Sequence, residues 1–442
     1  LKYMAAPVQA ITLVLGLMSL TVSRTSPSTM TLARFSKGGS SPKLSILLIL
    51  ILADRVKAAN VAPPSMPSSP RVQAAQRGHV TTLAGSGSEV HADGTGVAAG
   101  FIKPRKVAVS PDGMALYAGN WAGEHCIRKV AVATGVVTTL AGLGGTYGAI
   151  DGTGTDARFN SPIGVDVSGT IVYVADSFNN RIRQVTSTGV VTTLAGSLVG
   201  SDAAAGFSDG TGTDAKFNKP EGIAVSPDGG TLYVSEYINN RIRVVVVGTK
   251  MVTTLAGSGY AASIDGTGAA ASFNGPQDVA FSPSPYGLLL YVSDYGGHRI
   301  RKVVVATRDV TTLAGSGVAD SIDGTGTAAS FNGPLGVDTS PDGTVLYVAE
   351  SLNNLNNNIR QVDVETGDVT TLAGSGSCNH ADGMGTAASF CAPDGVAVSP
   401  EGRVLYVGDT LNHRIRQVAS SPLQPESDCG WQRMHQTVPF LF

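Results

Sequence analysis

The segment "VTTLAG" occurs six times in this 442-residue chain, beginning at Val80, Val137, Val191, Val252, Val310 and Val369. The intervals between successive copies are 57, 54, 61, 58 and 59 residues. A period of this length indicates one structural unit repeated in an array. Between copies the order is constant: an Asp-Gly loop, a proline, and then three further runs rich in Val, Ile, Tyr and Thr. The repeat constrains the fold more than any other feature of the sequence.

Each of the four runs in a unit alternates apolar with small or polar residues, as in "TLYVSEYINN" from Thr231 and "RIRVVVV" from Arg241. Such alternation is typical of β-strands, and the Gly, Asn or Pro-Asp-Gly between the runs supplies the turns. The apolar spacing of three and four that open α-solenoids need is absent from the units. Four short antiparallel strands repeated six times predict an all-β fold, a six-bladed β-propeller around a central channel.

The phase of the repeat predicts how the ring closes. The first copy has no preceding strands to pair with, whereas the last unit ends at Val418 without a copy after it. We therefore expect strand 79–85 to pair with the blade formed by residues 393–418, because an open ring would expose strand edges and an apolar blade face. The predicted propeller spans residues 79–418, and residues 419–442 form a C-terminal tail.

The first sixty residues are of a different kind. Residues 5–22 are mostly apolar, and Leu44–Ala53 is a ten-residue apolar run preceded by three basic residues. Such a run is too short to span a bilayer but suits the hydrophobic part of a signal peptide, which translation from Met30 would complete. We expect residues 1–60 to be a secretory signal or a membrane anchor and residues 61–78 to be a linker. The expected location is secreted or extracellular, with membrane contact only through the N-terminal segment.

Three motifs carry a resemblance to a known family: "YVSDYGGHRIRKV" from Tyr291, "YVGDTLNHRIRQV" from Tyr406 and "FNKPEGIAVSPDG" from Phe217. They resemble NHL repeats, named for an Asn-His-Leu signature at this turn. The resemblance extends over residues 79–418 and implies a six-bladed propeller. The family includes extracellular sensor domains, protein- and RNA-binding modules and an amidating lyase subset. Two asparagines replace Asn-His in several blades, and the turns of the first and fifth blades depart most from the signature.

The aspartate of the Asp-Gly loop lies eight residues before a phenylalanine in every unit. We expect the phenylalanine to be buried between blades. The aspartate should accept backbone N–H groups in an Asx-type turn, beside a glycine with positive φ. A calcium loop is the alternative, although each copy has few carboxylates for six or more oxygen ligands. The aspartates are Asp93, Asp151, Asp209, Asp265, Asp323 and Asp382, and the phenylalanines are Phe101, Phe159, Phe217, Phe273, Phe331 and Phe390.

The second arginine of "RIR" is present in every unit, and the residue before the turn is acidic in five of them. We expect ion pairs that brace the turn. A ring of free arginines binding a polyanion is the alternative. The arginines are Arg128, Arg183, Arg243, Arg301, Arg360 and Arg416, and the acidic residues are Asp176, Glu236, Asp294, Glu350 and Asp409.

Positions at which the blades differ are better candidates for ligand binding than positions that all blades share. The two residues after each loop proline should lie near one mouth of the channel, where mixed charge could bind a small polar ligand or a peptide. Solvated loop ends are the alternative. The charged and amide residues there are Arg105, Lys106, Glu221, Gln277, Asp278 and Asp394. Two positions after the second of these sites, Asp166 and Asp338 replace alanine.

Histidines and cysteines gather at the seam between the first and last units: His91, His125, His380, His413, Cys126, Cys378 and Cys391. In an oxidising compartment we expect disulfides between Cys378 and Cys391 and between Cys126 and Cys429. Free buried thiols are one alternative, and a zinc site made of thiols and histidines is another.

Composition bears on the ligand class. The chain has 31 basic and 33 acidic residues and no basic stripe, which argues against nucleic acid. The sequence offers no Ser/His/Asp arrangement, phosphate-binding loop or H-E-x-x-H motif placed to support catalysis. We expect a monomeric, cofactor-free binding module for a peptide, protein or glycan. The alternative is a calcium- or zinc-dependent propeller hydrolase or lyase with its site at the channel mouth or the seam.

Overall fold

The computed structural model describes residues 10–15, 18–26, 29–35, 76–198, 205–282, 288–352 and 355–420. Strands β1 (Ala10–Leu15), β2 (Met18–Ser26) and β3 (Thr29–Phe35) form an antiparallel three-stranded sheet. The predicted signal run Leu44–Ala53 and Cys429 in the tail lie outside the described residues. Within the described ranges, no helix is long and apolar enough to cross a membrane.

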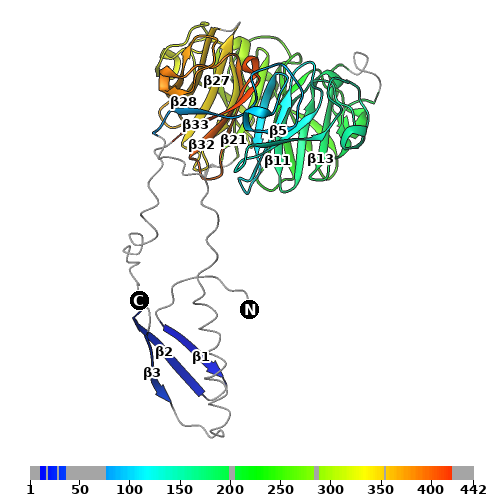
Figure 1. The fold of residues 1–442 in the computed structure, drawn as a ribbon. Coiled ribbons are helices and arrows are strands. Elements are labelled where there is room, and N and C mark those ends of the chain that lie inside the picture. Colours follow the sequence, from blue (N-terminus) through cyan, green and yellow to red (C-terminus); the bar gives the residue numbers. More distant parts are fainter. Residues whose placement is uncertain are drawn as a thin grey trace. The chain divides into compact units, whose positions relative to one another are not determined.

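Six five-stranded antiparallel sheets form the blades of a propeller (Figure 1), which confirms the predicted fold class. The inner strands line the channel, and they are β6 (Pro104–Val109), β11 (Pro162–Ser168), β16 (Pro220–Val225), β21 (Pro276–Ser282), β26 (Pro334–Thr339) and β31 (Pro393–Val398). The second strands are β7 (Ala115–Asn120), β12 (Ile171–Asp176), β17 (Thr231–Glu236), β22 (Leu289–Asp294), β27 (Val345–Leu352) and β32 (Val404–Asp409). The third strands are β8 (Ile127–Ala131), β13 (Arg181–Thr186), β18 (Arg241–Val246), β23 (Arg299–Val304), β28 (Leu355–Asp363) and β33 (Arg414–Ala419).

The "VTTLAG" copies form the fourth strands: β4 (His79–Ala84), β9 (Val136–Ala141), β14 (Val190–Ala195), β19 (Met251–Ala256), β24 (Asp309–Ala314) and β29 (Asp368–Gly376). The Asp-Gly loops add two-residue strands at the outer edges: β5 (Gly94–Thr95), β10 (Gly152–Thr153), β15 (Gly210–Thr211), β20 (Gly266–Thr267), β25 (Gly324–Thr325) and β30 (Gly383–Met384). A 3₁₀ turn follows each: η1 (Gly96–Ala98), η2 (Gly154–Asp156), η4 (Gly212–Asp214), η5 (Gly268–Ala270), η7 (Gly326–Ala328) and η8 (Gly385–Ala387). Three more lie between second and third strands: η3 (Ser177–Asn179), η6 (Tyr295–Gly297) and η9 (Thr410–Asn412).

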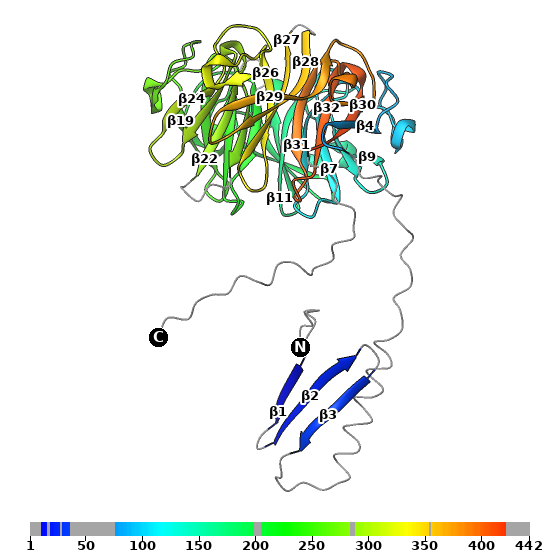
Figure 2. The same cartoon turned by 90° about the vertical axis from the view of Figure 1, so that its left-hand side faces the viewer.

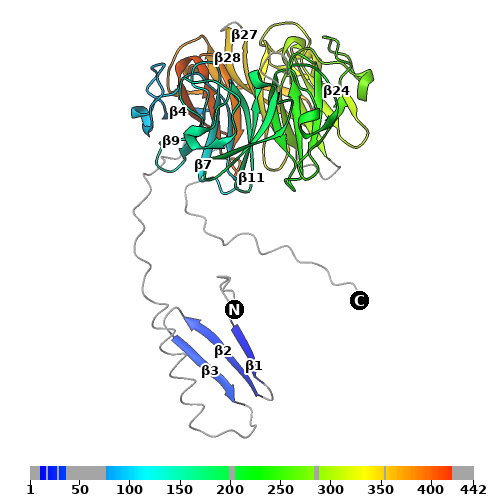
Figure 3. The same cartoon turned by 90° about the vertical axis from the view of Figure 1, so that its right-hand side faces the viewer.

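The ring closes through its first propeller strand, as the phase of the repeat predicts. Strand β4 pairs with β33 from Ile415 opposite Ala84 to Val418 opposite Val80, and β30 covers the other edge of β4. Figure 2 shows β4, in blue, among β30, β31 and β32. In Figure 3 the strands β7 and β9 of the next blade follow beside β4. The closing blade therefore contains segments from both ends of the propeller.

The six loop phenylalanines are fully buried, which confirms their predicted role. Phe217 shows the arrangement: it packs between Leu194 and Ala195 of the second blade and Ile223 and Leu232 of the third. Burying one such side chain contributes about 1.5–3 kcal/mol. Because each phenylalanine contacts two blades, the six together join neighbouring sheets around the ring.

The repeated arginines are also fully buried, so the alternative of a free arginine ring is wrong. In the third blade, the Arg243 guanidinium lies 2.8 Å from a carboxylate oxygen of Glu236 and 2.8 Å from one of Asp209. It also lies 5.1 Å above the Phe217 ring. The predicted pair with the acidic residue before the turn is confirmed in all five blades that have one. The loop aspartate adds a second carboxylate in every blade.

The loop aspartate differs from the predicted Asx-type turn. Asp151 accepts a backbone N–H at 3.0 Å and a hydroxyl at 3.0 Å from Thr193, which lies in the following "VTTLAG" copy rather than in the loop itself. Positive φ belongs to the second glycine of the loop, Gly154 at 56°, and not to the glycine beside the aspartate. Each aspartate thus joins the loop to the outer strand of the same blade, and these contacts account for it without a bound ion.

Candidate functional site

A β-bulge at the start of each inner strand sets the geometry of the channel mouth. The register shifts directly after the loop proline, for example between Pro104 and Val107. A bulge places an extra residue on one strand and redirects its side chain. As a result, the consecutive residues Arg105 and Lys106 both contact groups of other blades in the channel. In four blades the second position is glycine, and a Cβ on Gly164 would lie 2.1 Å from the carbonyl oxygen of Glu221.

Arg105 contacts three of the other five predicted mouth residues. Its Nε donates to Asp394 at 2.5 Å, its Nη1 lies 3.3 Å from Glu221, and its Nη2 donates to Gln277 at 3.2 Å. These partners come from the sixth, third and fourth blades. The side chain of Arg105 is only 11% exposed. The predicted residues therefore meet at one site, and the alternative of solvated loop ends is wrong.

Lys106 completes the network one layer further into the channel. Its Nζ lies 3.1 Å from Asp278 and 3.1 Å from Asp394. The first blade thus supplies both cations and other blades supply the carboxylates. Arg105 lines a mouth cavity of about 400 Å³, and Lys106 lines a deeper cavity of about 140 Å³ between the inner strands.

Burial and pairing have opposite effects on the carboxylates of this network. Burial raises the pKa of Glu221 and of Asp278 in spite of the nearby cations. Burial also acts to raise the pKa of Asp394, but its two cationic partners outweigh burial and the pKa is lowered. Burial acts to lower the pKa of Arg105, whereas Asp394 and Glu221 raise it and prevail. Asp394 is therefore the firmly ionised anion of the site.

An aromatic rim surrounds the mouth cavity, and sequence reasoning missed it. Trp121, Phe178, Tyr237 and Tyr295 line the cavity from the first four blades, while the fifth and sixth blades contribute Ser351 and Leu411. The Arg105 guanidinium lies 5.9 Å from the centre of the Trp121 ring, and the Lys219 ammonium lies 4.0 Å from that of Phe178. Five of these six residues lie between second and third strands, and Ser351 lies near the end of β27.

Asp166 and Asp338 line the deeper cavity. Each joins two blades, because one oxygen of Asp166 accepts the N–H of Val225 and one oxygen of Asp338 accepts the N–H of Val398, both at 2.7 Å. Burial raises the pKa of Asp166 to about 6 and that of Asp338 to about 7. Asp338 therefore carries a proton over a range in which an exposed aspartate is ionised.

This shift predicts a pH-dependent effect of Asp338→Asn. Burial raises the folded-state pKa of Asp338 from the ordinary aspartate value of 3.8 to about 7, so the contribution of this group to stability is fully present below about pH 4 and is lost as pH rises to about 7. The Asn side chain does not titrate. The free energy of unfolding of the wild type minus that of the variant should therefore shrink by a few kcal/mol between about pH 4 and about pH 8, measured by urea denaturation. A difference that stays constant over this pH range would contradict the assignment.

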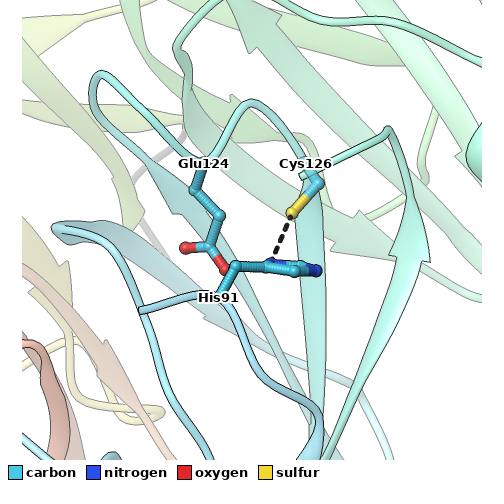
Figure 4. Close-up of side chains that lie close together, drawn as sticks. All are labelled: His91, Glu124 and Cys126. Carbon is cyan, nitrogen blue, oxygen red and sulfur yellow. Dashed lines mark hydrogen bonds and ion pairs between the residues drawn. The ribbon is translucent and has the colours of Figure 1, made fainter. Parts of the chain in front are cut away.

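The seam contains a cluster of His91, Glu124 and Cys126, whose possible ligand atoms lie within 4.8 Å of one another (Figure 4). His91 Nδ1 lies 2.9 Å from Glu124 and 3.8 Å from the Cys126 sulfur. The Arg128 guanidinium also contacts both His91 and Glu124, so a cation already lies against the cluster. Burial raises the pKa of the Cys126 thiol well above its usual value, which disfavours the thiolate that zinc binds. This donor set fits a metal ion poorly.

Glu124 has a structural role that the sequence pattern does not reveal. The first blade has Asn120 where five blades have an acidic residue, and Glu124 supplies the missing carboxylate to Arg128. Its other oxygen accepts the N–H of Ile102 at 3.0 Å. Asp176 accepts the N–H of Asn160 in the same way. Glu124 thus restores the buried pair from a different position in the turn.

Two of the remaining seam histidines, His125 and His413, form hydrogen bonds between neighbouring blades. His125 Nδ1 accepts the N–H of Ser161 at 3.2 Å, and His413 Nδ1 accepts that of Lys103 at 3.3 Å. Equivalent acceptors in the other blades are Asn180, Asn240, His298 and Asn357. Either an amide oxygen or an imidazole nitrogen can accept this bond, which explains why asparagine replaces the histidine of the signature. Among the described residues, only His91 of the four predicted histidines belongs to a cluster of potential metal ligands.

The cysteines follow the predicted pairing in part. Cys378 and Cys391 form a disulfide across the last Asp-Gly loop, and Cys126 is a buried free thiol. Its expected partner, Cys429, lies outside the described residues. His380, in the loop closed by this disulfide, lies 3.2 Å from the hydroxyl of Thr82 in β4.

Known proteins match both the repeat and the fold. The family model described as "NHL repeat" matches residues 217–245 in the third blade. NHL repeat-containing protein 2 of Bos taurus is 27% identical over 368 residues, which cover 72% of this chain and 49% of that protein. Protein SUPPRESSOR OF QUENCHING 1, chloroplastic, of Arabidopsis thaliana is 29% identical over 232 residues, which cover 50% of this chain and 21% of that protein. The chain thus spans about half or less of the length of these relatives.

A solved structure supports the fold independently. The auxiliary nutrient binding protein from Bacteroides thetaiotaomicron superposes with a TM-score of 0.57 at 19% identity, covering 77% of this chain and 76% of that chain. At this level of identity the likeness concerns the fold alone. Six blades of one pattern, a ring closed by β4 and the matching repeat model lead to one conclusion. The chain is an NHL repeat-containing six-bladed β-propeller.

Proposed function

We propose that this chain is an extracellular binding module whose ligand enters the mouth of the propeller channel. The observation that carries the proposal is the mouth cavity of about 400 Å³, within the usual range of ligand pockets. Its lining differs from blade to blade and combines an aromatic rim with a buried polar network. Such asymmetry is what recognition of one ligand requires, whereas the repeated residues are all engaged in holding the blades.

The disulfide supports the extracellular part of the proposal. Disulfides persist in oxidising compartments and are rare in the cytosol. The Cys378–Cys391 bond closes a loop of the blade that also closes the ring. A monomer suffices for the proposed role, because the mouth is built from residues of one chain.

A double variant of the aromatic rim and a matched control variant test the role of the mouth. Trp121→Ala combined with Phe178→Ala removes half of the aromatic rim. Met114→Ala is the matched control, because Met114 is 72% exposed in the turn at the other end of the β6–β7 hairpin from the mouth. The full chain and both variants are applied to peptide and glycan arrays. We expect the double variant to weaken the bound signal about tenfold or more, equivalent to about 1.4 kcal/mol, and the control to leave it unchanged.

Two results would contradict this role. One is a ligand whose binding is the same for the wild type and for the rim variant. The other is the absence of any bound member on either array. Equal melting temperatures of the three proteins establish that the comparison concerns binding and not folding.

A further inference from the structure

A second cavity of about 260 Å³ continues the mouth outward between the third and fourth blades. The two cavities share Tyr237 and Tyr295, whose rings meet edge to face with centres 6.4 Å apart. The outer cavity, which we call the Tyr groove, is otherwise lined by Ile238, Ala261, two asparagines and two glycines. A ligand longer than the mouth cavity can therefore extend over the tyrosine pair.

Within the part of the chain that the structure describes, no charged residue lines the Tyr groove. Its polar side chains are Asn240 and Asn274, and each is fixed by the backbone. Asn240 Oδ1 accepts the N–H of Gly275 at 2.8 Å, and Asn274 Nδ2 donates to the carbonyl of Gly296 at 2.9 Å. Rigid amides beside aromatic rings offer directional hydrogen bonds to a ligand at little cost in side-chain entropy.

The mouth cavity contains charges, but they are matched within the protein. Arg105 contacts Asp394 and Glu221, and Lys106 contacts Asp278 and Asp394. Lys219 lies over the Phe178 ring. The charged residues that line the mouth cavity itself are thus two cations, Arg105 and Lys219, and two carboxylates, Glu221 and Asp394. An ionic ligand that bound Arg105 or either carboxylate would have to break a buried pair, at a cost of about 3–5 kcal/mol, whereas a neutral ligand leaves the network intact.

We propose that the mouth cavity and the Tyr groove form one extended site for a neutral oligosaccharide. This inference rests on the proposed function and specifies its ligand class. Aromatic rings can stack against the C–H face of a sugar ring, and tyrosine and tryptophan provide both an apolar face and a polar group. The asparagine amides, Gln277 and the tyrosine hydroxyls pair with sugar hydroxyls. Because turn residues line the Tyr groove, it offers no open strand edge along which an extended peptide could add a strand.

Calorimetric titration of the full chain tests the ligand class. The probes are six neutral hexasaccharides, namely those of cellulose, amylose, xylan, laminarin, mannan and chitin, together with hexapeptides of neutral and of charged composition. We expect at least one saccharide to bind with a Kd below about 1 mM. Its affinity should change less than about twofold between about 0.05 and 0.5 M NaCl, because no ion pair with the ligand is screened.

Variants of the tyrosine pair locate the binding. Tyr237→Ala and Tyr295→Ala should each weaken the saccharide about tenfold or more, and Tyr295→Phe should retain most of the affinity because the ring remains. Tyr260→Ala is the control, since Tyr260 is 80% exposed in a loop of the same blade interface and lines neither cavity. Equal melting temperatures exclude loss of folding as the cause.

Each outcome decides between the two proposals. Saccharide binding that needs Tyr237 and Tyr295 supports both. Peptide binding that needs Trp121 and Phe178, without saccharide binding, keeps the binding module and overturns the saccharide. Saccharide binding that is unchanged by substitution of the tyrosine pair and of the rim overturns both proposals, because the ligand then binds elsewhere. No binding of any of the six saccharides overturns the saccharide assignment.

Discussion

Replacing Asp176 by Asn is expected to lower the free energy of unfolding by about 3–5 kcal/mol, a large fraction of the stability of a typical domain. Asp176 and Arg183 are both fully buried, with 2.8 Å between the carboxylate and the guanidinium. Removing the carboxylate charge leaves the arginine without its buried anion. Because Arg183 cannot lose its proton in a folded protein, its charge remains in the core with the half-exposed Asp151 as its remaining carboxylate partner. Urea denaturation measures the effect.

The same arginine provides a matched control. Asp151 lies 2.6 Å from Arg183, but its side chain is 48% exposed. Solvent screens that pair, so Asp151→Asn should cost about 1 kcal/mol or less. Equal losses for the two variants would show that burial does not determine the strength of the pair, and would contradict the scaffold role given to the repeated arginines.

Spacing made the scaffold predictable from the sequence. Five intervals of similar length separate the six "VTTLAG" copies that begin at Val80 and end with the copy at Val369. An unpaired strand at one end of the array matches a missing strand at the other. The same reasoning predicted that Arg105 and Asp394 lie at one mouth of the channel, because both directly follow a loop proline. In a closed ring, equal positions in the repeat lie at equal heights in the channel. Position in the unit therefore predicts position in space.

Sequence reasoning missed those residues whose position in the repeat does not match that of the residues with the same role in other blades. Glu124 takes the role of a residue four positions earlier, since the first turn follows a different path. Trp121 comes one residue after the end of its strand, whereas Phe178 comes two after. A rim assembled from unequal turn positions leaves no periodic signal. The bond from Asp151 to Thr193 was missed for another reason: the two residues are 42 positions apart, and register between strands decides their contact.

The closing strand carries the second large effect. Deleting residues 1–85 removes β4 and with it the buried side chains of Val80 and Ala84. It also exposes the edge of β33 and takes away Thr82, which donates to Asp382 at 3.1 Å. Burial of Val80 alone contributes about 1.5–3 kcal/mol, and the ladder with β33 and β30 adds to it. We expect a loss of about 5 kcal/mol or more, comparable with the whole stability of a small domain.

The control is deletion of residues 1–75, which leaves β4 in place. Both shortened chains lack the N-terminal apolar segments, so they differ only in ten residues that include the closing strand. Any effect of these N-terminal segments on solubility is therefore common to both.

Thermal unfolding of these two chains, followed by circular dichroism, tests most directly whether β4 closes the ring. If it does, the chain beginning at residue 76 melts in one cooperative transition at the temperature of the full chain, while the chain beginning at residue 86 melts more than about 10 °C lower or shows no cooperative transition. Equal melting temperatures for the two chains would contradict the closed ring, and with it the placement of the channel mouth.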